Sequence, residues 1–482
     1  MNAKRWLTAA LLAALPACQF CEEPPLETIP PNPDQTDEFC QRPASRVDIL
    51  WVIDNSGSML SEQNKVADRF SEFFRQLQTS LVDYHIGVIT TDIREGFNED
   101  ANGILRRYDG PSVPGCNGCR WLTKDVPCNN PNVTRNQGES DSAYEARLQN
   151  ECTAALVFRR LVTSGAGGGA FERGLESSTM ALGAIIDPDT GGYASVNGEP
   201  AVPDVNKGFL RRRTGTCQPV ANQAGLDCAQ QEGENCSEPA LYVIYVSDEE
   251  DGSSAPSSRY YYRVLEGLKG PGNEAKISTS AITGWPANAA VPITRACEIY
   301  NKAQDTDPNN DQEWPALERI LRKELGGCRD VNAAPEDGNA SAEVGTRYIE
   351  VACRTGGVVS DLCSGDYTTA LNQLGADAAG LARKFTISRW NEVFWGDDGE
   401  AFTPDDEDMN CDGDAATKDA QHRTFCVFAT PLGSDAEVLV RRDDATGWRL
   451  EPSTRSIRFD GSFIPKPGTK VTIKYRLKTQ GQ

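Results

Sequence analysis

The segment RVDILWVI, residues 46–53, is almost continuously apolar and runs directly into the polar sequence DNSGS. A strand that is apolar at successive positions is buried on both faces, which is typical of parallel sheets covered by helices. The next segment, residues 61–81, repeats large apolar side chains at helical spacing. A second apolar strand, YHIGVITTD, then ends at Asp92. This strand–helix–strand order predicts an α/β domain built on a parallel sheet.

The same pattern continues as far as residue 385, with interruptions. The segment ALYVIYVSDEED, residues 240–251, predicts another buried strand that ends in acidic residues. We expect KISTSAITG and RYIEVACRTGGVV to form the remaining strands and TALNQLGADAAGLARKF to form a final helix. Three long loop-like segments separate these elements, and we interpret them as insertions held by disulfides. Residues 46–385 are therefore predicted to form a doubly wound, mostly parallel sheet with disulfide-stapled insertions.

The last part of the chain has a different periodicity. In residues 386–482, the segments AEVLVRRDD, WRLEPSTRSIRFDG and TKVTIKYRLK alternate apolar and polar residues, with turn residues between them. Alternation at period two is typical of antiparallel strands with one face on a core and one face in solvent. We expect a small antiparallel β domain at this end of the sequence.

The first residues have the pattern of an export signal. Lys4 and Arg5 precede an apolar run, residues 6–17, that is too short to cross a bilayer permanently. The run ends in LPAC, which resembles the lipobox of bacterial lipoproteins, with a proline in place of the usual small residue. This resemblance implies that residues 1–17 are removed and that Cys18 carries a lipid that anchors the protein to a membrane. An ordinary secretory signal is the alternative.

Residues 18–45 are rich in Pro, Glu and Asp, a composition that predicts an extended tether rather than a packed core. We expect an exported protein of a bacterial cell envelope, either an outer-membrane lipoprotein or a protein of the cell surface or periplasm. The formal net charge of -22 argues against nucleic acid as a partner, because phosphates would be repelled. The 16 cysteines predict disulfides, and the CxxC of Cys116 and Cys119 lies in a loop typical of a structural bridge.

Acidic residues follow three predicted strands, and ligands of an open parallel sheet bind at that edge. We expect Asp54 and Asp248 to converge there with the hydroxyls of Ser56 and Ser58, and Asp92 to lie at the margin as a solvated strand end. Oxygen ligands with few carboxylates suit Mg²⁺, with Mn²⁺ or Ca²⁺ as alternatives. The competing interpretation is that the residues of the DNSGS loop only cap the next helix. A cap needs one such residue, however, and would leave Asp248 unexplained.

These residues resemble the metal-ion-dependent adhesion site of von Willebrand factor type A (VWA) domains. In that family, an Asp-x-Ser-x-Ser loop is joined by a Thr and an Asp from two later loops. Here DNSGS, residues 54–58, matches the loop and Asp248 matches the later Asp. The resemblance covers about residues 46–384. It implies a VWA fold and a divalent cation that keeps one coordination position for an acidic side chain of a partner protein or other macromolecule.

The chain departs from the family pattern at the threonine. Counting back six residues from Leu175 places Gly169 at that position, and glycine supplies no hydroxyl. Thr163 and Ser164 lie nearby as substitutes, and a water is the other alternative. The missing hydroxyl leaves open how tightly the site binds its cation, whereas the predicted fold does not depend on it. We interpret the surrounding segment GAGGGAF as backbone freedom near the metal, since it lacks the Lys-Ser/Thr ending of a phosphate-binding loop.

A second cation site is predicted in the acidic segment DMNCDGDAATKD, residues 408–419. Its oxygen-bearing residues fall at positions one, three, five, seven and twelve of the segment: Asp408, Asn410, Asp412, Asp414 and Asp419. This spacing resembles the calcium loop of EF-hand and dockerin modules, which implies Ca²⁺ as the bound ion. The alternative is an acidic, solvated linker without a cation.

Together these features favour a binding protein over an enzyme. The leading hypothesis is an envelope lipoprotein that binds a partner through the cation held at the strand ends. One alternative is a structural envelope scaffold in which metals only stabilise the fold. The other is a metal-assisted hydrolase. For that function only Asp92 and Glu249 are nearby candidates as general base, and the sequence shows no convincing Ser-His-Asp set.

Overall fold

The computed structural model describes the following segments of the chain, in which helices, strands and their connections are placed. They are residues 34–41, 46–80, 82–93, 100–169, 172–183, 195–196, 199–200, 202–211, 239–269, 276–305, 313–329, 341–364, 367–380, 384–394, 425–431, 433–442, 447–451, 455–459, 463–466 without 464, and 468–478. The export signal, Cys18 and the calcium-like loop at 408–419 lie outside these residues, so the expectations for them stay predictions. None of the described helices combines the length and the apolar character that crossing a bilayer requires.

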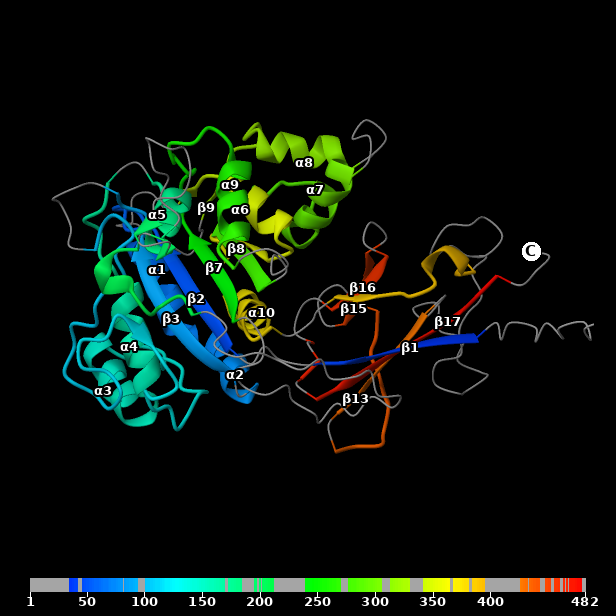
Figure 1. Cartoon of the computed structure of the whole chain (residues 1–482), viewed down its shortest axis with the longest axis horizontal. Helices are drawn as coiled ribbons and strands as arrows, with labels where there is room; N and C mark the ends of the chain where they lie inside the picture. Colours follow the sequence, from blue (N-terminus) through cyan, green and yellow to red (C-terminus); the bar gives the residue numbers. More distant parts are fainter. Residues whose placement is uncertain are drawn as a thin grey trace, which may run out of the picture.

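A six-stranded sheet organises the larger part of the chain (Figure 1). Its strands, in spatial order, are β11 (Val359–Asp361), β8 (Ile277–Thr283), β7 (Ala240–Val246), β2 (Arg46–Ile53), β3 (Asp83–Thr90) and β4 (Trp121–Leu122). All neighbouring pairs are parallel except β3 and β4, which pair antiparallel at one edge. The prediction of a mostly parallel sheet is therefore confirmed.

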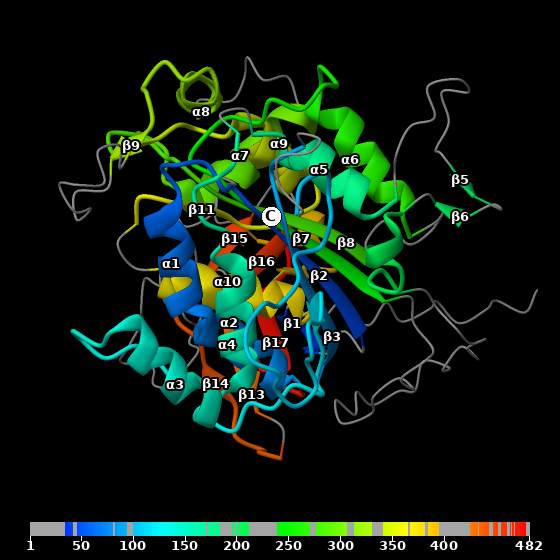
Figure 2. The ribbon, with the colours of Figure 1, turned by 90° about the vertical axis from the view of Figure 1, so that its left-hand side faces the viewer.

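Helices cover both faces of this sheet, as Figure 2 shows. The side chains of β2 alternate between two cores: Trp51 packs against Phe73 and Phe158 on one face, whereas Leu50 and Val52 join the core on the other. The first core is built with α1 (Leu60–Asp68), α2 (Phe70–Thr79), α4 (Thr153–Val162) and α10 (Thr368–Ala378). The second is built with α5 (Gly174–Ala181), α6 (Ser258–Gly267), α7 (Ala296–Asp305) and α9 (Thr346–Arg354). Burial on both faces explains why β2 is apolar at nearly every position.

Two predicted elements differ from those observed. The helix expected over residues 61–81 is divided at Arg69 into α1 and α2. The segment RYIEVACRTGGVV, expected to be a strand, begins with α9, and strand β11 starts only at Val359. A short apolar run does not by itself distinguish a strand from a buried helix. In α9 the helical period buries Tyr348, Ile349 and Ala352 against the sheet.

Disulfides hold the insertions, as expected from the cysteine content. Cys116 pairs with Cys119, which confirms the structural interpretation of the CxxC. The other pairs described are Cys128–Cys152, Cys297–Cys353 and Cys328–Cys363. The insertions also carry α3 (Asp141–Glu151), α8 (Trp314–Leu321) and the short strand pairs β5 (Ser195–Val196) with β6 (Glu199–Pro200) and β9 (Cys328–Arg329) with β10 (Ser341–Ala342).

The β-rich part, on the right of Figure 1, contains two antiparallel sheets around a common core. One has the order β1 (Asp34–Cys40), β17 (Lys470–Arg476), β13 (Phe425–Thr430) and β14 (Val438–Leu439). The other has the order β12 (Lys384–Thr386), β16 (Ser456–Phe459) and β15 (Trp448–Glu451). Trp448 and Tyr475 are buried between them. The predicted antiparallel arrangement is confirmed.

Within the tether predicted over residues 18–45, strand β1 corrects the prediction for residues 34–40. Asp34–Cys40 pairs with β17 along its whole length, from Asp34 opposite Arg476 to Cys40 opposite Lys470. The Glu38 carboxylate accepts from the Lys470 ammonium at 2.9 Å, and Phe39 packs on Phe385 with ring centroids 5.3 Å apart. An acidic composition therefore does not prevent strand formation here, because the neighbouring strand β17 supplies a basic partner and β12 of the other sheet supplies an apolar contact.

Candidate metal centre

The ends of β2, β3 and β7 meet at one edge of the parallel sheet. The Asp54 amide donates to the Val246 carbonyl at 3.0 Å, and the Thr91 amide donates to the Ile53 carbonyl at 3.2 Å. The chain passes from β2 to β3 on one side, whereas β7 lies on the other side of β2. Such a reversal of strand order opens a crevice beyond the carboxyl ends, where α/β proteins bind ligands.

The DNSGS loop is folded back on the carboxylate of Asp54. Asp54 Oδ1 accepts from the Ser56 amide at 2.8 Å, and Oδ2 accepts from the Ser247 hydroxyl at 2.7 Å. The hydroxyls of Ser56 and Ser58 lie 3.1 Å apart. Helix α1 starts after Met59, and no side chain caps its first turn. The loop therefore does not serve as the helix cap that the competing interpretation required.

Asp248, which follows β7, joins this group. Its side chain is buried, and Oδ1 has no hydrogen-bond partner among the described residues. Burial raises the pKa of Asp248, and hydrogen bonding from Ser58 offsets part of that rise. Burial and the negative charge of Asp248 together raise the pKa of Asp54. The structure thus brings together all four residues that the sequence assigns to the metal: Asp54, Ser56, Ser58 and Asp248.

A fifth residue, Glu172, was missed by the sequence analysis. Its side chain is 1% exposed; Oε2 accepts from the Thr91 hydroxyl, whereas Oε1 has no partner among the described residues. Burial and then the charge of Asp54 raise the pKa of Glu172, with further contributions from Glu249 and Asp248. The sequence signal was its position directly after GAGGGAF and just before α5, in the loop where the VWA family has its threonine.

The glycine-rich loop lies directly against the DNSGS loop. The Gly168 amide donates to the Asn55 carbonyl at 2.8 Å, and a Cβ on Gly168 would lie 2.5 Å from that oxygen. The amide of Gln63 bridges the two loops, donating to the carbonyls of Asp54 at 2.8 Å and of Gly165 at 3.1 Å. A glycine is therefore required at 168 by the close approach of the two backbones. The sequence analysis had attributed this segment to backbone freedom near the metal instead.

The remaining candidates differ in their positions. The Thr163 hydroxyl donates to the carbonyl of Arg159 in the last turn of the preceding helix α4, so it does not substitute for the missing threonine. Ser164 lies at the start of the glycine-rich loop, and its buried hydroxyl has no partner among the described residues. Asp92 is buried two residues beyond β3, with its carbonyl accepting from the Asn102 amide at 2.8 Å. It is not the solvated strand end that was expected.

The donor set fits a hard divalent cation. Asp54, Glu172 and Asp248 are 0%, 1% and 6% exposed, and none forms an ion pair with a described basic side chain. Burying a carboxylate without a positive partner costs roughly several kcal/mol in the free energy of folding. All the donors are oxygens, and unpartnered oxygens remain on Asp248, Glu172 and Ser164. Such sites suit Mg²⁺, Mn²⁺ or Ca²⁺ rather than metals that prefer sulfur or imidazole.

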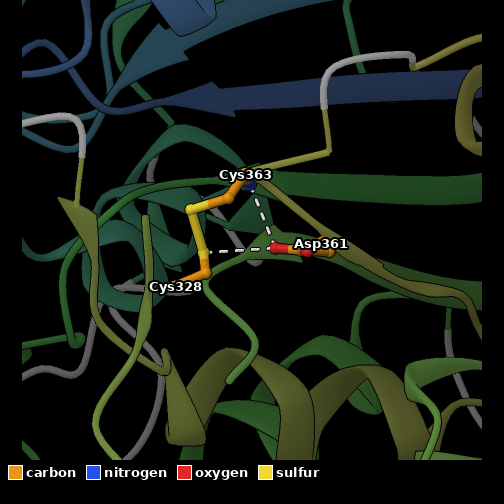
Figure 3. A group of neighbouring side chains, drawn as sticks. All are labelled: Cys328, Asp361 and Cys363. Atoms are coloured by element: carbon orange, nitrogen blue, oxygen red, sulfur yellow. Dashed lines mark hydrogen bonds between the residues drawn. A yellow bond between two sulfur atoms is a disulfide. The ribbon is translucent and has the colours of Figure 1, made fainter. Parts of the chain in front are cut away.

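Another group of potential ligands, shown in Figure 3, is not a comparable site. Cys328 and Cys363 are joined in a disulfide, and Asp361 Oδ1 accepts from the Cys363 amide at 3.0 Å. Metal ligation by cysteine needs a free thiolate, which a disulfide does not provide. We therefore interpret this group as a structural bridge between the β9 segment and the end of β11.

No protein-family model and no curated protein matches the chain. Solved structures with some similarity include a von Willebrand factor type A protein from Catenulispora acidiphila, with 8% identity, a TM-score of 0.27 and coverage of 92% of this chain and 65% of that one. Another is the open conformation of the pilus adhesin SpaC from Lactobacillus rhamnosus GG, with 10% identity, a TM-score of 0.26, and coverage of 93% of this chain and 41% of that one. A third is the pilus adhesin RrgA from Streptococcus pneumoniae, with 12% identity, a TM-score of 0.20, and coverage of 92% of this chain and 58% of that one. The chain thus spans less than two thirds of each of these proteins, and similarity at such scores carries no argument about it.

Proposed function

We propose that this protein binds a macromolecular partner through a divalent cation held at the ends of β2 and β7. The observation that carries the proposal is the convergence of Asp54 and Asp248, from strands on either side of the crevice, in a buried group of oxygen donors that has no ion pair with a described basic side chain. The hydroxyls of Ser56 and Ser58 contribute to the coordination. A partner protein or other macromolecule supplies the last ligand, an acidic side chain on the pattern of the VWA family.

The solvent side of the site supports this role. Gly57 at the tip of the DNSGS loop is exposed, and Leu60, which begins α1, is 49% exposed. Leu60 is one of three large apolar side chains that are exposed among the described residues. An exposed apolar residue beside a polar anchor is the combination that a protein interface uses. The proposed setting is the bacterial envelope, with Cys18 as the lipid anchor and a calcium ion in the segment 408–419.

A structural scaffold remains the second candidate, because a cation between buried carboxylates stabilises the fold whether or not a partner binds. The two functions separate in one experiment. Envelope extracts are passed over the immobilised protein with divalent cation or with chelator, and bound proteins are identified. Loss of a specific partner in chelator, with the protein still folded, supports cation-mediated binding. A partner that stays bound in chelator supports the scaffold.

Variants locate the effect at the site. We expect Asp54→Asn to abolish cation binding in isothermal titration and partner capture together, because it removes the central carboxylate. Asp204→Asn is the matched control, since Asp204 is exposed and pairs only with Lys207 among the described residues. Failure of the wild-type protein to bind Mg²⁺, Mn²⁺ or Ca²⁺, or binding that is unchanged in Asp54→Asn, would overturn the proposal.

A further inference from the structure

The carboxylate of Asp54 is held by a neutral donor on each of its two oxygens. The Ser56 amide donates to Oδ1 at 2.8 Å, and the Ser247 hydroxyl donates to Oδ2 at 2.7 Å. Ser56 belongs to the same loop as Asp54, whereas Ser247 follows β7 and reaches Asp54 from the neighbouring strand. Ser247 is 1% exposed, so water does not compete for this hydrogen bond.

The position of Ser247 is itself fixed by the elements around it. Its amide donates to the Ile282 carbonyl of β8 at 3.2 Å, and the carbonyl of the preceding residue, Val246, accepts from the Asp54 amide at 3.0 Å. Its hydroxyl oxygen accepts from the Glu249 amide at 3.1 Å. A hydroxyl has a single proton to donate. The charged Asp54 carboxylate at 2.7 Å is a stronger acceptor for that proton than the Glu249 carbonyl at 3.2 Å, so the proton is directed at Asp54.

Asp48, another fully buried acid of β2, has a different kind of partner. Arg211 Nε donates to Asp48 Oδ1 at 2.7 Å, and Lys269 Nζ lies 3.4 Å from Oδ2. These two basic side chains neutralise the charge of Asp48. At Asp54, an amide and a hydroxyl orient the carboxylate without cancelling its charge. Such hydrogen bonds are typical of carboxylates that bind a metal ion.

We propose that Ser247 is a positioning residue of the cation site, whose hydroxyl holds the Asp54 carboxylate in the orientation that binds the ion. The inference rests on the proposed cation site. Ser247 acts through Asp54 and is not itself a ligand. Its hydroxyl also ties the loop after β7, which carries Asp248, to the loop after β2, so the two carboxylates keep their positions relative to each other.

The size of the expected effect follows from the behaviour of other metal sites. The hydrogen-bonding partners of metal ligands fix the orientation of those ligands, and losing one partner costs about 10–100-fold in metal affinity. Without the Ser247 hydroxyl, Asp54 keeps the hydrogen bond from the Ser56 amide in its own loop but loses its link to the loop after β7. The cation must then order the carboxylate as it binds.

The test is isothermal titration of the full chain with MgCl₂, MnCl₂ and CaCl₂, comparing wild type with Ser247→Thr and Ser247→Val. Both substitutions add a methyl group, and they differ in that only threonine keeps the hydroxyl. The ratio of their affinities therefore isolates the hydroxyl. For the ion that wild type binds most tightly, we expect Ser247→Thr to bind at least about tenfold more tightly than Ser247→Val.

Ser178→Ala is the control for a purely structural effect. Ser178 is a fully buried serine of α5, and its hydroxyl lies 2.9 Å from the Tyr245 hydroxyl and donates to the Leu175 carbonyl at 2.8 Å rather than to a proposed ligand. We expect Ser178→Ala and Ser247→Val both to lower the urea midpoint in chelator, because each loses hydrogen bonds in the interior. Only Ser247→Val should also weaken cation binding, and Ser178→Ala should stay within about twofold of wild type.

The outcomes separate the inference from the proposed function. Equal cation affinities of Ser247→Thr and Ser247→Val, in a protein whose wild type binds the ion, would overturn the inference and leave the cation site intact. A lowered urea midpoint of Ser247→Val with unchanged cation affinity would overturn it in the same way, since Ser247 would then be structural only. Wild type that binds none of the three ions would overturn the proposed function itself.

A measurement on wild type alone covers the case in which Ser247→Val does not fold. A crystal structure of the protein grown with the cation that it binds most tightly should keep the Ser247 hydroxyl oxygen within about 3.0 Å of an Asp54 carboxylate oxygen. A bound ion with the Ser247 hydroxyl beyond about 3.5 Å from both Asp54 oxygens would contradict the assignment, since that distance excludes a hydrogen bond.

Discussion

The contact between the glycine-rich loop and the DNSGS loop gives a prediction whose size follows from the structure. Gly168→Ala would place a Cβ 2.5 Å from both the carbonyl oxygen and the side-chain Oδ1 of Asn55. Ordinary contact begins at 3.4 Å, so the loops must separate by about 0.9 Å, the difference between these two distances. The carbonyl cannot rotate away, because it also accepts from the Gly168 amide at 2.8 Å.

Gly168→Ala has two destabilising effects and one stabilising effect on the free energy of unfolding. Overpacking costs about 1–3 kcal/mol, and a weakened backbone hydrogen bond costs about 0.5–1.5 kcal/mol. Reduced freedom of the unfolded chain returns about 0.4–1 kcal/mol. We expect a net loss of about 1–3 kcal/mol in the free energy of unfolding. Because Asn55 lies between Asp54 and Ser56, the same shift should weaken cation binding.

Urea unfolding in chelator measures the stability, and isothermal titration measures the cation affinity. Gly167→Ala is the control, since a Cβ there meets nothing within 4 Å. We expect that variant to stay within about 0.5 kcal/mol of wild type. If Gly168→Ala matched Gly167→Ala in both measurements, the close approach of the two loops, and the reasoning built on it, would be refuted.

Three further outcomes are expected. Asp54→Asn should lower cation affinity at least about a hundredfold, measured by titration calorimetry, since a direct ligand matters more than its supports. The pKa values of Asp54, Glu172 and Asp248 are raised in the metal-free protein, so the folded state binds more protons than the unfolded state above about pH 4. Thermal melts in chelator should therefore show that stability falls as the pH rises from about 5 to about 8. Saturating Ca²⁺ should remove this trend. Replacing Cys328 and Cys363 by Ser opens a bridge between residues 35 apart and should cost about 3–4 kcal/mol in urea unfolding while leaving cation affinity unchanged; an affinity loss would show that the Figure 3 group does bind metal.

Local patterns were sufficient for the central sheet and the first half of the site. The apolar run over residues 46–53 predicts burial on both faces because its side chains alternate between two helical layers. Asp54 follows that run directly, so the position of its carboxylate at the strand end is a consequence of the sequence alone. The same holds for Asp248 after β7. That β2 and β7 pair in parallel, and so bring the two carboxylates together, is a tertiary contact that neither segment specifies by itself.

Tertiary structure alone decided the rest, because the contacts involved join distant parts of the chain. Glu172 becomes part of the site through the hydroxyl of Thr91, 81 residues earlier, and nothing in its own neighbourhood predicts that contact. Strand β1 exists because β17, more than 400 residues later, offers a free edge with Lys470 opposite an acidic strand. The periodicity of a sequence indicates which face of an element is buried, but it does not indicate which distant element covers that face. The burial of Glu172 and the pairing of β1 both depend on the distant element.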